Sequence, residues 1–215
     1  MTAIMSAFHG IIDRAAQQEE RQEQHMLSSL QLLNDTLATT PIAGRYWMFA
    51  GLVLGWAREG RLLRHDCKDA DFAYLGDDEE LLQASFPILA AAGFEPLYRF
   101  PTVEGPATEY CLQREGLRFD FFRLELEGDA FRYYNYGYAG PGWTNPAANE
   151  CAIPAQPLEE IRYLGRTWLK ARDHDVELTG LYGDWRTPDK GWNYMNAPSV
   201  VAQRPWDDSS HRWHG

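Results

Sequence analysis

Two aspartates separated by one residue are the strongest chemical signal in this sequence. Asp69 and Asp71 lie in the run DADFAY (69–74), in which the other residues are alanine, phenylalanine and tyrosine. That composition predicts a β-strand, and side chains two residues apart in a strand point to the same face. Two carboxylates on one face repel each other and are costly to bury unless a cation lies between them. The spacing therefore predicts a site for Mg²⁺ or Mn²⁺, which prefer oxygen ligands.

A third aspartate occurs in a similar apolar context. Asp120 lies between aromatic residues in the run RFDFF (118–122), which also predicts a strand. Acids in the middle of apolar strands are rare, because burying a lone charge is unfavourable. We predict that Asp69, Asp71 and Asp120 together form the catalytic and metal-binding group. Asp120 could also act as the general base that takes a proton from an acceptor hydroxyl.

A glycine follows a short apolar run upstream of the acids. The run Tyr46–Ala50 (YWMFA) predicts a buried strand, and residues 52–58 have apolar side chains at helical spacing. Gly51, between them, permits a sharp turn of the backbone. A strand that delivers a glycine to a helix N-terminus leaves amide donors free to bind a phosphate. We therefore predict a phosphate contact at Gly51.

The loop between this helix and the acid pair is basic. Arg58, Arg61 and Arg64 could clamp phosphates or could simply be solvated. Asp66, just before the pair, could be an outer metal ligand, and a role in capping the loop is an equal alternative.

The order and spacing of these motifs resemble the LicD/fukutin family of nucleotidyltransferase-fold proteins. The resemblance rests on GLVLGWAR (51–58), the aspartate pair, Asp120 in its apolar strand, and LYGDWRTP (181–188) followed by Trp192. It covers roughly residues 46–198. It implies an enzyme that moves a phosphocholine or phospho-polyol group from a CDP-activated donor to a hydroxyl of a glycan or small molecule.

Position by position, the resemblance assigns Asp69 and Asp71 to the family's acidic pair and Asp120 to its later acid. The residues that it places near substrate or phosphate are Gly51, Leu52, Arg58 and Lys68. Leu52 stands where many members have threonine or serine, and Lys68 stands where an acidic or aromatic residue is common. The loop between Arg58 and the acid pair is slightly longer than usual. The sequence also lacks the cysteine cluster and membrane anchor of the animal members, which implies a minimal enzyme of bacterial type.

Two other functions are compatible with the same residues. A nucleotidyltransferase would move the nucleotide itself from an NTP to a small molecule or protein. A catalytically silent interaction module would keep the fold without turnover, although an unused carboxylate pair on a buried face would be destabilising.

Composition narrows the class of partner. With 215 residues the chain can form one globular domain with an appended helical part. Its net charge of −11 argues against nucleic acid as the main partner, because a phosphate backbone requires a basic footprint. The three cysteines lack CxxC spacing and predict reduced thiols. The sequence has neither a basic signal-peptide start nor an apolar run of about 20 residues, so we expect a cytoplasmic protein without an integral membrane segment.

The elements that must position the acids predict an α+β fold. We expect a nucleotidyltransferase-like mixed or antiparallel sheet flanked by helices, with an N-terminal helix and a C-terminal helical or irregular extension. The expected segments are an N-terminal helical part at 1–40, a catalytic core at 41–150 and a C-terminal part with an aromatic-rich tail at 151–215, all in one compact unit.

Within these segments the apolar periodicity predicts individual elements. The expected helices span 11–38, 79–92, 157–172 and 174–181, and the expected strands span 94–100, 108–113, 117–126 and 130–134. Residues 136–151, rich in Gly, Pro, Asn and Tyr, predict an irregular binding or lid loop whose aromatics stack on a ligand or pack over the sheet edge. The chain beyond about Gln203 is expected to be poorly ordered.

Overall fold

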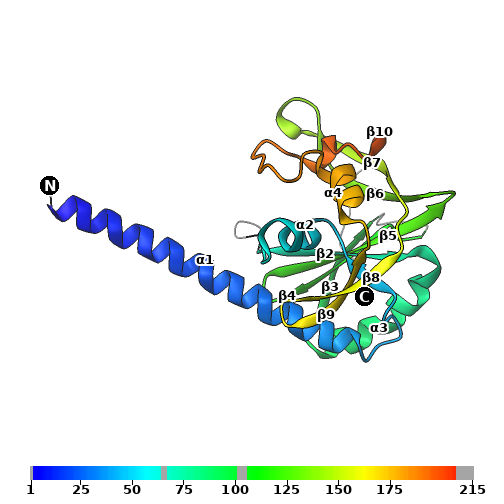
Figure 1. Ribbon diagram of the computed structural model, residues 1–215, viewed down its shortest axis with the longest axis horizontal. Helices are drawn as coiled ribbons and strands as arrows, with labels where there is room; N and C mark the ends of the chain where they lie inside the picture. The colour runs from blue at the N-terminus through cyan, green and yellow to red at the C-terminus, as the bar shows by residue number, and fades with distance from the viewer. Residues whose placement is uncertain (1, 64–66, 101–105, 207–215) are drawn as a thin grey trace.

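The computed structural model describes residues 2–63, 67–100 and 106–206 of the chain. Over these ranges the chain forms an α+β fold, in which four α-helices flank a mixed, largely antiparallel, open sheet (Figure 1). This confirms the predicted class. The helices are α1 (Thr2–Leu37), α2 (Ala50–Glu59), α3 (Glu79–Ala91) and α4 (His174–Tyr182). The short 3₁₀ helices are η1 (Gly76–Asp78), η2 (Pro141–Trp143) and η3 (Tyr194–Asn196).

One large sheet organises the domain. Its strands are β1 (Tyr46–Met48), β2 (Asp69–Leu75), β3 (Glu95–Phe100), β4 (Glu109–Arg114), β5 (Leu117–Glu127), β6 (Ala130–Ala139), β7 (Asn145–Pro154) and β10 (Val200–Pro205). Strands β2 and β5 are parallel, and the other registered pairs of the sheet are antiparallel. The parallel pair places the two predicted acid strands side by side at the centre.

The sheet forks along the edge of β5 that faces away from β2. Strand β4 pairs with the first half of β5 as far as Phe122, and β6 pairs with the second half from Glu125 onward. Strand β2 occupies the opposite edge along most of this length. Strand β6 then leaves β5 and continues as a ribbon with β7 and β10. The fork leaves a space between β4 and β6 in which a site can form.

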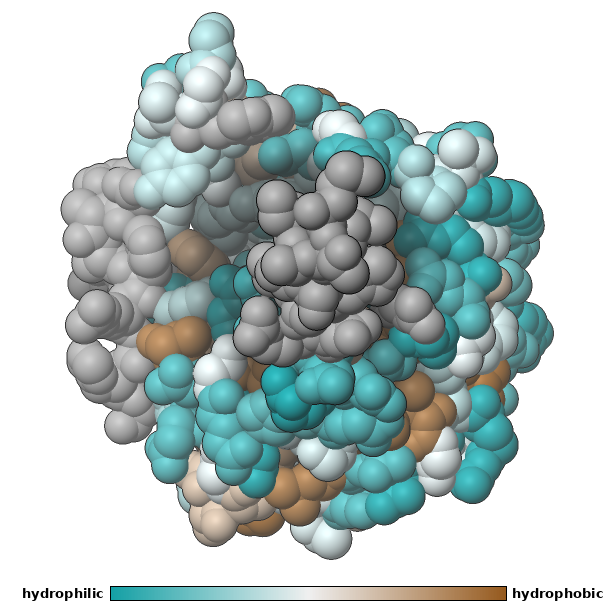
Figure 2. All heavy atoms as spheres, turned by 90° about the vertical axis from the view of Figure 1, so that its left-hand side faces the viewer, coloured by the Kyte–Doolittle hydropathy of each residue, from teal (hydrophilic) through white to brown (hydrophobic). Residues whose placement is uncertain are grey.

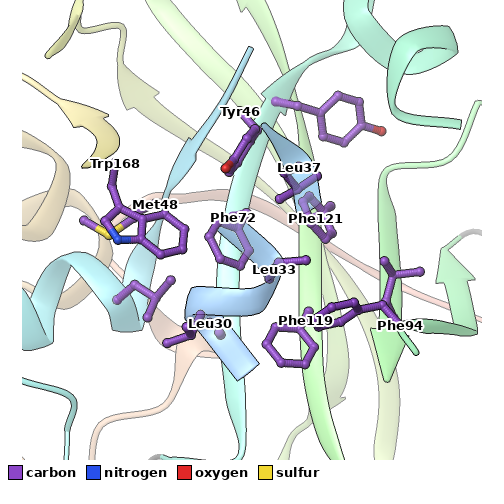
Figure 3. Packing of buried hydrophobic residues seen from close by; sticks show 14 of the residues in the cluster. Leu30, Leu33, Leu37, Tyr46, Met48, Phe72, Phe94, Phe119, Phe121 and Trp168 are labelled. Atoms are coloured by element: carbon purple, nitrogen blue, oxygen red, sulfur yellow. The ribbon is translucent and has the colours of Figure 1, made fainter. Parts of the chain in front are cut away.

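The long N-terminal helix is anchored through its second half. Helix α1 is continuous over 36 residues, about 54 Å at the usual helical rise, and its N-terminal part projects away from the domain (Figure 1). Its fully buried hydrophobic side chains recur at helical spacing and are Met26, Leu30, Leu33 and Leu37. Three of these leucines point at the aromatic side chains of β2 and β5 (Figure 3). The apolar periodicity that predicted this helix thus marks its core-facing surface.

The predicted helix at 157–172 is wrong. This segment forms a hairpin of β8 (Leu158–Tyr163) and β9 (Arg166–Ala171), which turns at Leu164 and Gly165, both with positive φ. Paired positive φ angles are what a tight two-residue hairpin requires. The proline and two glutamates at its start match a helix N-terminus, but the aromatic side chain of Trp168 decides the outcome. Its ring stacks on Phe72 at 5.8 Å and is buried in the core.

The predicted irregular loop at 136–151 is also wrong. Strand β6 continues to Ala139, and β7 pairs with it from Asn145, so that only a short turn remains between them. Strand β7 is rich in alanine and asparagine, which have low intrinsic strand preference, and it is held between β6 and β10. Strand β10 likewise gives regular structure to Arg204 and Pro205, contrary to the expected disorder there. The expectation for 207–215 lies outside the described residues.

One face of the molecule reflects the polar composition of the chain. The face toward which α1 projects is covered mainly by hydrophilic residues, with isolated hydrophobic patches (Figure 2). Among the described residues, no helix is both long and apolar enough to cross a membrane.

Candidate active site

The strand registers bring charged residues from three strands to one face of the sheet. Asp71 of β2 lies directly opposite Asp120 of β5, and Asp69 lies opposite Arg118. Strand β4 pairs antiparallel with β5 on the other side and places Cys111 opposite Asp120. Because Glu109 is two residues from Cys111, it shares this face. All three predicted aspartates therefore lie together, joined by two charged residues that the sequence analysis did not select.

Asp120 lies at the centre of this face and is almost fully buried. The Tyr98 hydroxyl donates a hydrogen bond of 3.2 Å to Asp120 Oδ1, and the Cys111 thiol is a second hydrogen-bonding neighbour. Burial raises the pKa of the Asp120 carboxyl to about 6, although these hydrogen bonds and the charge of Arg118 oppose the rise. A carboxyl with this pKa is largely ionised at neutral pH yet accepts a proton more readily than an ordinary aspartate.

Asp69 is more exposed and is paired with a cation. Its carboxylate accepts a hydrogen bond from the guanidinium of Arg118, the residue opposite it in the register. Nearly half of the Arg118 side chain is exposed, so one side of the guanidinium is accessible. Arg118 is the positive charge that the site presents to an anionic ligand.

Glu109 adds a fourth carboxyl at the base of the fork. It is 6% exposed, and burial together with the charges of Asp120 and Asp71 raises its pKa well above the ordinary value. Clustered acids of this kind repel each other when they ionise, and a divalent cation would relieve that repulsion.

The glycine turn faces these acids from α2. The Gly51 amide donates a hydrogen bond of 3.3 Å to Asp71 Oδ2, and the Phe49 amide donates to the Asp71 carbonyl oxygen at 3.0 Å. The residue with a left-handed backbone is Ala50, at φ 43°, and not the glycine that the sequence pattern had indicated. The first turn of α2 is thus held directly against the acid strand.

A cavity of about 510 Å³ unites these groups. Its charged floor consists of Asp69, Asp71, Glu109, Arg118 and Asp120, and Ala50 and Gly51 form one side. The opposite walls are aromatic and come from β3, β6 and the C-terminal segment. There the rings of Phe100 and Tyr136 stack at 4.7 Å, and the Tyr194 hydroxyl donates to the Tyr136 carbonyl oxygen. The volume is that of a typical small-molecule site.

The aromatic walls include segments whose role the sequence left open. Tyr136 and Tyr138, from the predicted loop, and Trp192 and Tyr194, from the tail, all line the cavity. Tyr138, Trp192 and Tyr194 are also among the more exposed large hydrophobic residues of the described chain. These side chains are placed to contact a ligand as well as the sheet.

Three of the predicted substrate-binding residues lie away from the cavity. Leu52 is buried in the core, and Lys68 is exposed at the surface. Arg58 donates to the Trp185 carbonyl oxygen at 3.4 Å and forms an ion pair with Glu59 at 3.2 Å.

The remaining candidates of the basic loop are Arg61, Arg64 and Asp66. Arg61 is paired with Glu23 of α1 at 2.6 Å. The interpretations of Arg64 and Asp66 fall outside the described residues. Among the residues proposed for phosphate that the structure describes, only Gly51 lies against the acids.

The donor set fits a hard divalent cation in its chemistry. Among the described residues, no three Asp, Glu, His or Cys side chains converge as the ligands of a bound ion do. Asp71 and Asp120 nevertheless occupy opposed positions on adjacent strands, with Glu109 on the same face. Burial first, and then the charge of neighbouring carboxylates, raises the pKa of both Asp120 and Glu109, so ionising them together is unfavourable without a cation. Asp69 would be available as a further ligand once released from Arg118.

Comparison of the chain with protein-family models and with curated proteins yields no match. The functional argument therefore depends on the geometry and chemistry of the site.

Proposed function

We propose that this protein is a metal-dependent transferase that moves a phospho-alcohol group, of phosphocholine or phospho-polyol type, from a CDP-activated donor to a hydroxyl of a glycan or small molecule. The observation that carries the proposal is the meeting of the acid cluster, Arg118 and the Gly51 amide in one cavity. Phosphoryl-type transfer requires charge neutralisation and alignment of the reacting groups more than covalent chemistry. This site offers the groups for both.

Each residue has a role in this proposal. Asp71 and Asp120 would hold the metal, with Glu109 and Asp69 as further carboxylates within the same cavity. The bound Mg²⁺ or Mn²⁺ would neutralise the diphosphate charge of the donor. Arg118 binds a phosphate oxygen on its exposed side, exchanging part of its contact with Asp69. The Gly51 amide, which donates to Asp71 in the free site, would turn to another phosphate oxygen when Asp71 binds the metal.

The proton of the acceptor hydroxyl needs a base on the same face. Asp120 would take this proton through a carboxylate oxygen that the metal leaves free; in the site without metal, burial raises its pKa to about 6. The aromatic walls exclude water from the acceptor side and offer flat surfaces on which a sugar or base can stack.

The CDP donor and the nucleotidyltransferase-like core are the parts of the proposal that rest on the motif resemblance. The strand, glycine turn and helix of β1 and α2, followed by the Asp-x-Asp strand β2, support that core arrangement. Nucleotidyl transfer from an NTP would use the same carboxylates, with attack at a different phosphorus.

Calorimetric titration of CDP and CTP, with and without Mg²⁺, tests the proposal. Wild type is compared with Asp71→Asn and with Asp129→Asn, which alters an exposed turn aspartate. We expect Mg²⁺-dependent CDP binding that Asp71→Asn abolishes and Asp129→Asn retains. Much tighter binding of CTP than CDP would favour nucleotidyl transfer. Absence of CDP and CTP binding, both with and without Mg²⁺, would contradict both enzymatic functions and favour an interaction module.

A further inference from the structure

Strand β6 contributes a buried asparagine to the wall of the cavity. Asn135 is 9% exposed and lines the cavity together with Tyr133 and Gly137, which lie two residues to either side on the same face of the strand. The Asn135 Nδ2 donates to Cys151 Sγ at 3.6 Å. Its Oδ1 is buried and has no hydrogen-bond partner among the described residues. The cavity wall therefore contains a carbonyl acceptor that the fold does not use.

The asparagine on the neighbouring strand shows how a structural role differs. Asn149 of β7 lies directly opposite Asn135 in the register and is fully buried, but it does not line the cavity. Its Nδ2 donates to the Met195 carbonyl oxygen at 3.1 Å, and its Oδ1 accepts from Gln203 Nε2 at 2.8 Å. Because a buried acceptor without a partner lowers stability, folding does not account for the open carbonyl of Asn135. A ligand that donates to Oδ1 does account for it.

An aromatic ring is held close to this asparagine. A Cβ on Gly137 would come within 2.3 Å of the Tyr194 hydroxyl oxygen, so the glycine allows Tyr194 to lie against β6. There the Tyr194 hydroxyl donates to the Tyr136 carbonyl oxygen at 3.0 Å. Tyr194 also lines the cavity and is 40% exposed. An aromatic face next to a hydrogen-bonding group is the combination with which proteins stack a nucleobase and recognise its edge.

The wall that carries Asn135 is connected to the acid face of the sheet. Phe122 follows Asp120 by two residues on that face, and its ring packs edge-to-face on Tyr133 with the centroids 6.5 Å apart. Tyr133 in turn precedes Asn135 by two residues on the same face of β6. A nucleotide whose diphosphate lies over the acids can therefore extend its base toward Asn135 within the same cavity.

We propose that Asn135 is a specificity-determining residue for the base of the ligand, whose Oδ1 accepts a hydrogen bond from the exocyclic amino group of cytosine. Uracil has a carbonyl oxygen in place of this amino group, so two acceptors would face each other and both would stay unpaired. The ligand, a pyrimidine nucleoside diphosphate, rests on the proposed function. The residue that selects its base is the new element.

The test measures the ratio of CDP to UDP affinity by calorimetry with Mg²⁺. Asn135→Leu removes the acceptor at similar volume, whereas Asn135→Asp keeps an acceptor in the same place. Asn196→Leu, at an exposed position that does not line the cavity, is the matched control. The ratio is used because the added charge of Asn135→Asp weakens both diphosphates alike. 2′-Deoxy-CDP is the third ligand, since it distinguishes a contact with the base from a contact with the ribose 2′-hydroxyl.

We expect wild type to bind CDP about tenfold more tightly than UDP, because a site that hydrogen-bonds a donor rejects an analogue without it. Asn135→Leu should reduce this ratio to about twofold, and Asn135→Asp and Asn196→Leu should retain it. 2′-Deoxy-CDP should bind wild type within about twofold of CDP.

Four outcomes would overturn the proposal. An unchanged ratio in Asn135→Leu would exclude recognition of the base by Asn135 and leave the proposed function intact. A preference of wild type for UDP that Asn135→Leu abolishes would mean that the amide donates to the ligand. Weak binding of 2′-deoxy-CDP that Asn135→Leu equalises with CDP would assign the contact to the ribose. Absence of CDP, CTP and UDP binding to wild type would contradict the proposed function and remove this role with it.

Melting temperatures of the ligand-free proteins test the premise that folding does not use the carbonyl. Asn135→Leu should melt within about 2 °C of wild type, whereas Asn149→Leu, which loses two hydrogen bonds, should melt clearly lower. An equal fall for the two variants would overturn that premise. If Asn135→Leu does not fold, Asn135→Ala removes the acceptor with less bulk and should show the same reduced ratio of CDP to UDP affinity.

Discussion

The two faces of strands β2 and β5 have opposite chemistry although they share the same backbone. On one face Phe72, Phe119 and Phe121 are fully buried under α1, with Phe72 stacked on Phe121 at 5.2 Å. On the other face the first alternating residues of both strands are charged, with Asp71 opposite Asp120, and the later ones belong to a second apolar cluster. Along either strand, neighbouring residues therefore point alternately to the hydrophobic core and to the face that carries the candidate site.

This contrast shows how the fold can hold a repulsive cluster. The aromatic face and its helix supply the burial that stabilises the sheet. The sheet then fixes the acids at the strand spacing, where mutual repulsion alone would separate them. If this division is correct, substitutions on the aromatic face should lower stability, whereas removal of an acid from the charged face should raise it. Substitutions on the charged face should have the larger effect on ligand binding.

The largest stability loss is expected on the aromatic face. Phe119→Ala removes a fully buried ring that packs edge-to-face on Phe94 at 5.2 Å. Such truncations cost about 3–5 kcal/mol, and chemical denaturation should show a loss of this size. Leu126→Ala, at an exposed hydrophobic position, is the control and should change stability by less than about 0.5 kcal/mol. Equal losses for the two variants would mean that this face is not the stabilising core.

The largest functional loss is expected one residue away from that face. Asp71→Asn keeps the shape of the side chain and removes the charge that would hold the metal. Loss of one preorganised electrostatic group of this kind costs about 10²–10³-fold in kcat. The measurement is turnover of a CDP-alcohol donor, with melting temperature recorded in parallel. A fall in activity that is matched by a fall in melting temperature would assign Asp71 to structure instead.

The charged face should also make stability depend on pH, whereas the phenylalanines of the aromatic face do not titrate. Burial raises the pKa of Asp120 from 3.8 to about 6, so the folded state binds this proton more tightly than the unfolded state. Stability is therefore lost as the pH rises from about 4 to about 6, by about 3 kcal/mol at 1.4 kcal/mol per pKa unit. Asp120→Asn removes this loss and should be more stable than wild type at pH 7 in EDTA. Denaturation at pH 4 and pH 7 checks this, and a variant less stable than wild type at both would contradict it.

The sequence predicted the acids of this site because strand alternation is a local property. The period of two placed Asp69 and Asp71 on one face, and the apolar neighbours of Asp120 placed it in a buried strand. The same rule could have found Arg118, two residues before Asp120, and it would have extended to Glu109 once the pairing of β4 was known. What the sequence could not supply was the register between strands, which depends on contacts far apart in the chain.

The mispredicted segments show the same limit for the fold. Residues 157–172 begin with Pro157 and two glutamates, a pattern shared by helix starts and strand ends. Trp168 settles the conformation through its contact with Phe72, more than ninety residues earlier in the chain. Strand β7 is likewise held by its two neighbours more than by its own composition. Local signals are sufficient where an element packs mainly through its own periodicity, as α1 does.

The smallest predicted effects compare Arg118, the cation that the structure places in the cavity, with Lys68, a cation expected there from the sequence. Arg118 lines the cavity beside Asp69, whereas Lys68 is exposed outside it. Arg118→Gln should weaken Mg²⁺-dependent CDP binding about tenfold, the effect of one lost charge-assisted contact. Lys68→Gln, the matched loss of one positive charge, should change it less than about twofold. Calorimetry at two salt concentrations checks both, because a distant charge acts only through screened electrostatics. A larger effect of Lys68 at both salt concentrations would place the phosphate on the loop side of the acids and not over β5.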